Sequence, residues 1–250
     1  MELTSSFERV IPASVLERYT WVETRNAAAV LQASNPEQFA DLVAVLAEFA
    51  VYDADILTAG GNRGQIAIRL DAAFEARGWD AVRVNTVHRL EGLRKSKLSG
   101  RAYDERFLEE EVRNEGFEVD NMKGRVALDV EWNAKDGNLD RDLAAYRALY
   151  DLGLVDVAAI VTRDHYAVRD LAALDLGSED AARRLGTTTT TNMAKLEPRL
   201  TRGDAGGCPI LGIGITRATW AGAGVPAPHV EVDDDVAALF ALEQDADPEA

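Results

Sequence analysis

Cysteine and histidine are scarce in this chain of 250 residues, which contains one cysteine, Cys208, and three histidines. A single cysteine excludes a disulfide framework and a cysteine-based zinc site. Three scattered histidines argue against a histidine-rich metal site. No apolar run reaches the roughly 18 residues that a membrane span requires, and residues 1–10 lack the basic-then-apolar order of a signal peptide. We therefore expect a cytoplasmic protein that does not associate with membranes.

Basic residues are also in the minority. The chain has 27 Lys and Arg against 43 Asp and Glu, a formal net charge of −16, and eight of the acids lie in residues 231–250. Six bases nevertheless cluster within nineteen residues that contain one acid, Glu91. These bases are Arg83, Arg89, Arg94, Lys95, Lys97 and Arg101. Because a local positive patch can bind a polyanion even in an acidic protein, the charge leaves open both DNA binding and a solvated face.

Hydrophobic residues make up 47% of the chain, which is enough for the core of one domain. We expect a single domain over residues 1–230, followed by an acidic, loosely ordered C-terminal tail over residues 231–250. The residue pattern predicts helices over 8–20, 36–51, 65–77, 139–152 and 165–176, strands over 79–87, 117–120, 125–132, 155–161 and 209–216, and a turn at 121–124. This order predicts an α/β fold with a mixed β-sheet flanked by helices.

Two glycine-rich segments fall short of known phosphate-binding motifs. Residues 60–64 (GGNRG) lack the Gly-Lys-Ser/Thr ending of a nucleotide P-loop, and Gly212-Ile213-Gly214 lacks the third glycine of a dinucleotide fingerprint. The Gly-x-Ser-x-Gly elbow of a serine hydrolase does not occur. We therefore expect these glycines to serve the backbone and not to bind a nucleotide.

Three acidic residues are grouped in a predicted hairpin. Asp120 ends its first strand, and Asp129 and Glu131 lie two apart on the second. Side chains two apart on a strand point to the same face, and Asp120 can approach them across the hairpin. Because carboxylates at short range repel one another, a hard divalent cation is the natural compensation. The alternative is an exposed acidic edge strand neutralised by Arg125 and Lys135.

The order of these acids, followed by a helix, resembles the core of the PD-(D/E)XK nucleases. The run over residues 129–142 (DVEWNAKDGNLDRD) resembles the corresponding segment of the BglII/BstYI family of type II restriction endonucleases. The resemblance continues in residues 147–163 and 206–210 and, upstream, in 26–30, 60–62 and 78–79. It implies a PD-(D/E)XK restriction-endonuclease-like core and hydrolysis of phosphodiester bonds in double-stranded DNA at a short palindrome with a GATC centre. It also implies Mg²⁺ as cofactor and a homodimer.

The resemblance assigns roles to the three acids. Asp120 matches the first metal-binding aspartate and Asp129 the second acid, which is usually glutamate, so both are implied Mg²⁺ ligands. Glu131 matches the third position, which is lysine in most nucleases of the superfamily. All three are implied catalytic residues. An acid at the third position indicates activation of water by a carboxylate, with Lys123 or Lys135 as the alternative.

DNA must also be held by basic, amide and hydroxyl side chains near the acids. The candidates are Asn133, Lys135 and Arg141 directly after the acids, Thr189, Thr190, Asn192 and Lys195 from the polar run over residues 186–195, and Arg94, Lys95 and Lys97 from the basic cluster. For the residues directly after the acids, the alternative is a role in turns and helix caps. For the polar run, the alternative is an ordinary strand or capped loop. Two other functions stay open: a nuclease of this fold with a repair or modified-DNA role, and a DNA-binding protein that has lost cleavage.

Overall fold

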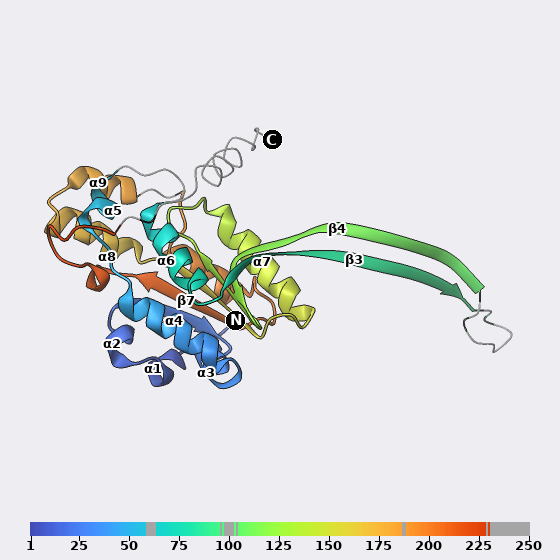
Figure 1. Ribbon diagram of the computed structural model, residues 1–250. Coiled ribbons are helices and arrows are strands. Elements are labelled where there is room, and N and C mark those ends of the chain that lie inside the picture. The colour runs from blue at the N-terminus through green and yellow to red at the C-terminus, as the bar shows by residue number, and fades with distance from the viewer. Residues whose placement is uncertain are drawn as a thin grey trace.

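The computed structural model describes residues 1–58, 64–95, 97, 103, 105–186, 189–228 and 230. In this part of the chain, seven strands form one sheet in the order β1-β2-β7-β6-β5-β4-β3 (Figure 1). The strands are β1 (Leu3–Thr4), β2 (Tyr19–Thr24), β3 (Asp80–Arg94), β4 (Glu105–Lys123), β5 (Val126–Val130), β6 (Val157–Arg163) and β7 (Ile210–Ile215). β5, β6 and β7 run parallel, and the other neighbours are antiparallel. The predicted mixed α/β sheet is confirmed.

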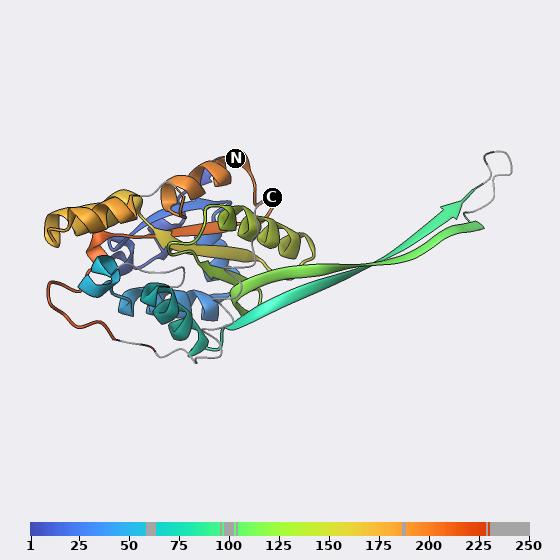
Figure 2. The same ribbon diagram turned by 90° about the horizontal axis from the view of Figure 1, so that it is seen from above.

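Helices cover both faces of the sheet (Figures 1 and 2). α3 (Ala27–Ser34), α4 (Pro36–Glu48) and α6 (Gln65–Glu75) pack on one face, and α7 (Gly137–Asp151) and α10 (Met193–Arg202) pack on the other. The remaining helices are α1 (Phe7–Val10), α2 (Ala13–Leu16), α5 (Asp53–Leu57), α8 (His165–Asp170), the π-helix η1 (Leu171–Asp175), α9 (Glu179–Leu185) and the 3₁₀ helix η2 (Arg217–Thr219).

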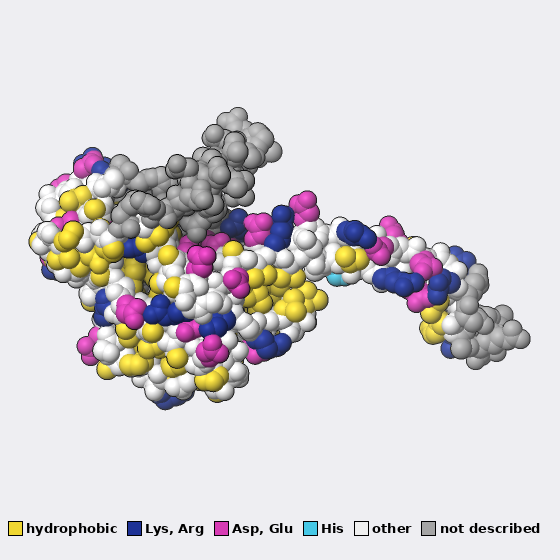
Figure 3. Space-filling model, in the orientation of Figure 1, with side chains coloured by type: hydrophobic (Ala, Val, Ile, Leu, Met, Phe, Trp, Pro, Cys, Tyr) yellow, Lys and Arg dark blue, Asp and Glu magenta, His cyan; other side chains and the backbone are white. Residues whose placement is uncertain are grey.

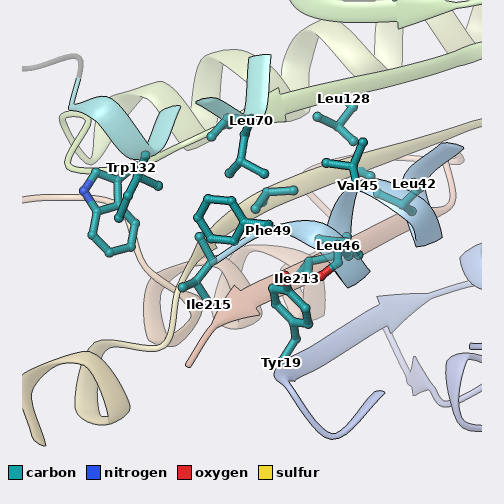
Figure 4. Close-up of a cluster of buried hydrophobic side chains, with 14 of the residues drawn as sticks. Tyr19, Leu42, Val45, Leu46, Phe49, Leu70, Leu128, Trp132, Ile213 and Ile215 are labelled. Carbon is teal, nitrogen blue, oxygen red and sulfur yellow. Dashed lines mark hydrogen bonds between the residues drawn. The ribbon is translucent and has the colours of Figure 1, made fainter. Parts of the chain in front are cut away.

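The central strands alternate their side chains between the two helical layers, as period-two geometry requires. On β5, Leu128 packs with Leu42 and other residues of the α4 layer (Figure 4). Ala127 packs instead in the α7 layer, with Tyr146. Asp129 has the same parity as Ala127 and accepts a hydrogen bond from the Tyr146 hydroxyl. Asp129 of β5 therefore faces away from Leu128, toward the α7 layer.

The predicted helix over residues 8–20 is wrong. Pro12 separates two short helices, because it lacks an N–H group and restricts the residue before it. The chain then enters β2 at Tyr19, which pairs with Ile215 of β7. This pairing is long-range and overrides the local helical pattern. α3 and α10 also form where no helix was predicted, and the predicted helix over 165–176 changes to a π-helix at Leu171.

Gly212 and Gly214 serve packing, as expected. A Cβ atom on Gly212 would lie 2.6 Å from Cγ1 of Val22 and 2.8 Å from Cδ2 of Leu196. A Cβ atom on Gly214 would lie 2.5 Å from Cγ of Met193. Contacts this short are sterically forbidden, so the two glycines allow α10 to lie close against β7.

The hairpin between β4 and β5 turns later than predicted. Residues 121–123 belong to β4 and pair with residues 126–128, so the loop consists of Gly124 and Arg125 and not of residues 121–124. Gly124 adopts a φ of +59°, which a glycine takes at little steric cost. The consequence is that Asp120 and Asp129 directly follow the last pair of this ladder, Asn121 and Leu128, and lie beside each other.

β3 and β4 extend as a two-stranded ribbon far beyond the rest of the sheet (Figures 1 and 2). The strand predicted over residues 79–87 continues to Arg94. We call residues 86–94 and 105–114 the arm. Its base contains a register shift between Val84 and Thr86, where a Cβ atom on Gly116 would lie 1.6 Å from the Val84 carbonyl oxygen. Glycine therefore permits the close backbone contact at which the arm begins.

Arg83, Arg89 and Arg94 of the basic cluster lie on this ribbon, where acids of the opposite strand neutralise much of the positive charge. Arg89 lies 2.7 Å from Glu109, and Arg106 of β4 lies 2.6 Å from Glu91. Figure 3 shows basic and acidic side chains interleaved along the arm. Along the described residues of the arm, a continuous positive patch is therefore not formed, because the count along one strand omits the acids that the partner strand places opposite.

Some predictions fall outside the described residues. These are the C-terminal tail over residues 231–250, residues 60–63 of the first glycine-rich segment, and Arg101. The single domain over residues 1–230 stays a prediction. Among the helices that the structure describes, none has the length and hydrophobicity needed to cross a membrane.

Candidate active site

A β-bulge brings Asp120 to Asp129. β4 contains one residue more than β3 between the positions that pair with Asp80 and Val82. Bulges of this kind redirect side chains and are frequent beside active sites. The Asp120 N–H group donates to Oδ1 of Asp129 at 2.7 Å. The first two predicted acids therefore lie together.

Asp129 is held from both sides of its carboxyl group. Its side chain is buried between β5 and α7, and the Tyr146 hydroxyl donates to its second oxygen, Oδ2. With the Asp120 N–H group on Oδ1, each oxygen has one donor. The carboxyl group is thus fixed in position before any ligand arrives.

Glu131 directly follows β5, and hydrogen bonds fix its main chain. Its N–H group donates to the Val161 carbonyl at 2.8 Å. Its own carbonyl accepts from Oγ1 of Thr162 at 2.9 Å and from Oγ1 of Thr191 at 2.8 Å. The Glu131 carboxyl group is buried beside that of Asp142. The third predicted acid therefore joins the other two.

Asp142 of α7 is a fourth acid of this cluster, and the sequence analysis missed it. Its side chain is buried and interacts with the carboxyl groups of Glu131 and Asp120. One signal was available: Leu139, Asp142, Tyr146 and Leu149 recur at helical spacing, and all four are buried. An acid on the apolar face of a helix indicates a site and not a solvated position.

Burial raises the pKa of all three enclosed carboxyl groups. Burial raises the pKa of Glu131 to about 7, and the charges of Asp129 and Asp120 add to the effect. Burial, followed by the charges of Asp142 and Asp120, raises the pKa of Asp129 well above its usual range. The pKa of Asp142 rises for the same main reason. The cluster therefore retains protons near neutral pH until a positive charge compensates it.

The basic residues near the cluster differ in position. Nε of Arg141 lies 3.5 Å from Oδ1 of Asp142, and its charge lowers the pKa of Glu131. Lys123 points to the opposite face of the sheet, where its ammonium group contacts Asp41 of α4 at 2.9 Å. Lys123 is therefore not placed to activate water at Glu131, whereas Arg141 adjoins the acids.

The donor atoms of the cluster suit a divalent cation. Oε2 of Glu131 and Oδ2 of Asp142 are buried without a hydrogen-bond partner in the described structure. Hard carboxylate oxygens are the ligands that Mg²⁺ prefers. No three His, Cys, Asp or Glu side chains in the described residues are already arranged as a complete ligand set. A cation at Asp120 and Asp129 would therefore need a main-chain carbonyl, a water or a small side-chain movement as well.

We expect Glu131→Gln to stabilise the metal-free protein at pH 8 but not at pH 4. Folding raises the Glu131 pKa from 4.5 to about 7. The protonated Glu131 carboxyl group therefore contributes to the free energy of unfolding. This contribution is fully present below pH 4.5 and is lost as the pH rises through about 7. Glutamine does not ionise, so the variant avoids this loss, which amounts to about 3 kcal/mol. Thermal unfolding in EDTA at both pH values measures the effect.

The control for this experiment is Glu197→Gln, which changes an exposed acid on α10. Its effect on the unfolding temperature should be small at both pH values. Added Mg²⁺ should stabilise the wild type at pH 8 by offsetting the same charge. An equal stabilisation of Glu131→Gln at pH 4 and pH 8 would contradict the assignment of a raised pKa to this carboxyl group.

Several predicted DNA-binding residues lie together beside the acids. Lys135 forms an antiparallel bridge with Thr190, and the Asp136 N–H group donates to the Thr189 carbonyl at 2.9 Å. Nζ of Lys195 lies 3.4 Å from the Asp136 carboxylate. The segment after Glu131 and the polar run are therefore adjacent, although some fifty residues separate them in the sequence.

Asn192 has a structural role in this arrangement. It is buried at the start of α10, where Oδ1 accepts from the Lys195 N–H group at 3.2 Å. Its amide nitrogen donates to the Thr190 carbonyl at 3.2 Å. Helix capping, the alternative weighed for this residue, accounts for its contacts.

The structure does not bring Arg94, Lys95 and Lys97 to the acids. They lie at the far end of the arm, which Figure 1 shows well away from α7. The guanidinium group of Arg94 lies 4.8 Å from the ring centroid of Phe107, and the Lys95 ammonium lies 5.5 Å from that of Tyr103. Any contact of these bases with DNA must occur outside the acidic site.

Arg163 is a further residue of this region that the sequence analysis did not single out. It is the last residue of β6 and contacts Asn133 and Thr190, two of the predicted DNA-binding residues. No sequence motif marks it, because a buried strand that ends in arginine has no distinctive spacing.

The chain matches a family model described as restriction endonuclease BglII/BglIII over residues 19–215. The match begins at the first residue of β2 and ends at the last residue of β7. It therefore includes the four acids, Arg141 and Arg163. A comparison with curated proteins finds no match.

Proposed function

The chain belongs to the restriction endonuclease family BglII/BglIII, and from this membership we propose that it cuts both strands of a GATC-centred palindrome as a Mg²⁺-dependent homodimer. The family resemblance recognised in the sequence is correct. Membership supports a type II restriction endonuclease, which is a site-specific deoxyribonuclease that binds double-stranded DNA. Enzymes of this kind generally use divalent metal ions. The observation that carries the proposal is the convergence of Asp120, Asp129, Glu131 and Asp142 at the end of β5.

We assign Asp120 and Asp129 as the Mg²⁺ ligands and Glu131 as the residue that orients water and accepts its proton. Mg²⁺, when bound, shields the phosphate charge and lowers the pKa of water. A carboxyl group with a pKa of about 7 is suited to exchange a proton near neutral pH. Arg141 is placed beside Asp142, where its guanidinium group can hold a phosphate oxygen.

The duplex is proposed to lie over the surface next to these acids. Lys135 and Lys195 would neutralise phosphates, while Asn133, Thr189 and Thr190 would reach base edges or the backbone. Arg94, Lys95 and Lys97 at the end of the arm would contact DNA outside the recognised bases, which gives affinity but no sequence preference. Since the proposed target is inside the cell, we place the enzyme in the cytoplasm.

Digestion of a phage genome tests the proposed specificity. We expect discrete fragments in the presence of Mg²⁺, no cleavage in EDTA, and fragment ends that all derive from one six-base palindrome containing GATC. Each wrong base pair in the site costs ~1–3 kcal/mol, so cleavage at other sequences should be slower by about 10- to 100-fold or more per mismatch.

Other results of the same digestion separate the alternatives. Ends without GATC would overturn the specificity and leave the endonuclease standing. A smear would indicate a nuclease with a repair or other non-specific role. A gel shift without cleavage at any divalent metal concentration would indicate a DNA-binding protein that has lost its activity.

A further inference from the structure

Arg163 is a buried cation without an acidic partner. Its side chain is 1% exposed at the end of β6, and it forms no salt bridge with any residue that the structure describes. Burial lowers its pKa to about 10, and no neighbouring carboxylate opposes that effect. A buried charge is costly unless other interactions hold it. Its position therefore calls for a role beyond stability.

The guanidinium group instead holds two polar side chains. Nη1 donates to Oδ1 of Asn133, and Nη2 donates to Oγ1 of Thr190 at 2.6 Å. The group lies 5.8 Å from the ring centroid of Trp132, and Nε is buried without a partner in the described structure. Arg163 thus connects the segment after Glu131 with the polar run, both of which border the acidic site.

Asn133 adopts a backbone conformation that few residues other than glycine adopt. Its φ is +59°, in the left-handed region, and it lies two residues after Glu131. Among residues other than glycine, asparagine is one of those that enter this region most readily, so the main chain turns here at modest cost. The contact with Arg163 then fixes the side chain as well. Asn133 as a whole is half-buried, so part of the residue is accessible to solvent.

Arginine has only donors, and this decides which way the Asn133 amide points. With Oδ1 turned to Arg163, the two hydrogens on Nδ2 are the groups left to meet a ligand. We propose that Arg163 is a positioning residue that turns Asn133 into a base-reading site for a hydrogen-bond acceptor on the edge of a base. This inference rests on the proposed function, because it takes DNA as the ligand. The acceptors available in the major groove are guanine N7 and O6, adenine N7 and thymine O4, whereas the cytosine amino group is a donor and is rejected.

Duplexes with single-atom changes in the target identify the base. The probes are duplexes that contain the proposed GATC-centred palindrome, with 7-deazaguanine, 7-deazaadenine, 2-aminopurine or 4-thiothymine at one position of each half-site. We expect one of these changes to weaken wild-type binding by about 10- to 100-fold, the discrimination of a good base contact. Fluorescence anisotropy measures affinity, and cleavage is measured separately.

The variants then show whether Arg163 acts through that contact. Arg163→Met and Asn133→Asp should bind the unmodified duplex about 10- to 100-fold less tightly. For each of these variants, the affinity for the sensitive analogue duplex should be at most about twofold lower than for the unmodified duplex, because the contact is already absent. Arg163→Lys keeps one donor and should restore part of the discrimination. Arg9→Met, an exposed arginine on α1, is the matched control and should retain the wild-type sensitivity.

Two results would overturn the inference. If no analogue weakens wild-type binding, Asn133 does not read an acceptor. Suppose that Arg163→Met and Arg163→Lys fold normally by circular dichroism and bind both duplexes more weakly, but keep the wild-type ratio between the two affinities. Arg163 is then only structural. Sequence-specific binding without cleavage would instead overturn the proposed nuclease activity and leave the base-reading site intact.

Discussion

Replacing Asp129 with asparagine is expected to abolish DNA cleavage while DNA binding persists. Asparagine has nearly the same size and keeps an oxygen for the Asp120 N–H group or the Tyr146 hydroxyl. It loses the negative charge that a divalent cation requires in this buried position. Loss of metal-assisted chemistry worth several kcal/mol corresponds to a rate lower by about 10³-fold or more. Plasmid cleavage with Mg²⁺ and gel shifts in EDTA measure the two properties.

Asp120→Ala and Glu131→Ala are expected to behave like Asp129→Asn. Without metal, affinity for DNA should be unchanged or higher in all three variants, because a carboxylate that repels the phosphates is gone. Asp151→Asn, at the exposed end of α7, is the control and should cleave normally. A near wild-type rate for any of the three variants would show that the residue is not part of the catalytic machinery.

Replacing both Phe107 and Leu108 with aspartate is expected to convert the proposed homodimer into monomers. The two faces of the arm differ in character. Leu108 pairs with Gly92, and the Phe107 ring occupies the space that a Gly92 side chain would need. Leu90 lies on the same face as Gly92 but pairs with Glu110, so this face carries several apolar side chains and one acid. Phe107 is 55% exposed and Leu108 39% exposed.

The opposite face of the arm is charged. Arg89 and Glu91 lie on it with Glu109, and Arg106 connects the two acids. A two-stranded ribbon is at best marginally stable in water, so its apolar face should be covered. DNA offers no comparable apolar surface, whereas the proposed homodimer supplies a second copy of the chain. We therefore assign the apolar face of the arm to the second copy.

Two buried large apolar side chains contribute about 1.5–3 kcal/mol each, so the dimer dissociation constant should rise by about 10²- to 10⁴-fold. Sedimentation measures the mass, and cleavage at low protein concentration should fall in parallel. Val87→Asp is the matched control, because Val87 is equally exposed but lies on the charged face of the arm. A dimer that survives the double substitution would refute the assignment, as would a wild type that is monomeric.

The sequence was sufficient where neighbours along the chain determine the outcome. Period-two geometry alone placed Asp129 of β5 on the face opposite Leu128, and Glu131, which directly follows the strand, joins it in the acidic cluster. The apolar pattern of residues 155–161 and 209–216 marked β6 and β7, since buried parallel strands are continuously hydrophobic. The acidic run also led to the family. Asp142 was equally accessible to this reasoning, through its place on the apolar face of α7.

Only the tertiary structure decided which distant residues meet. The bases of β3 look like a positive patch until β4 brings Glu109 within 2.7 Å of Arg89, and a bulge, not the hairpin spacing, turns Asp120 toward Asp129. The raised pKa of Glu131 depends on burial, which no local pattern specifies. The physical reason is the range of the interactions. Helix and strand periodicity depend on residues only a few positions apart in the sequence. Ladder register, ion pairing and desolvation depend on segments that only the complete fold brings together.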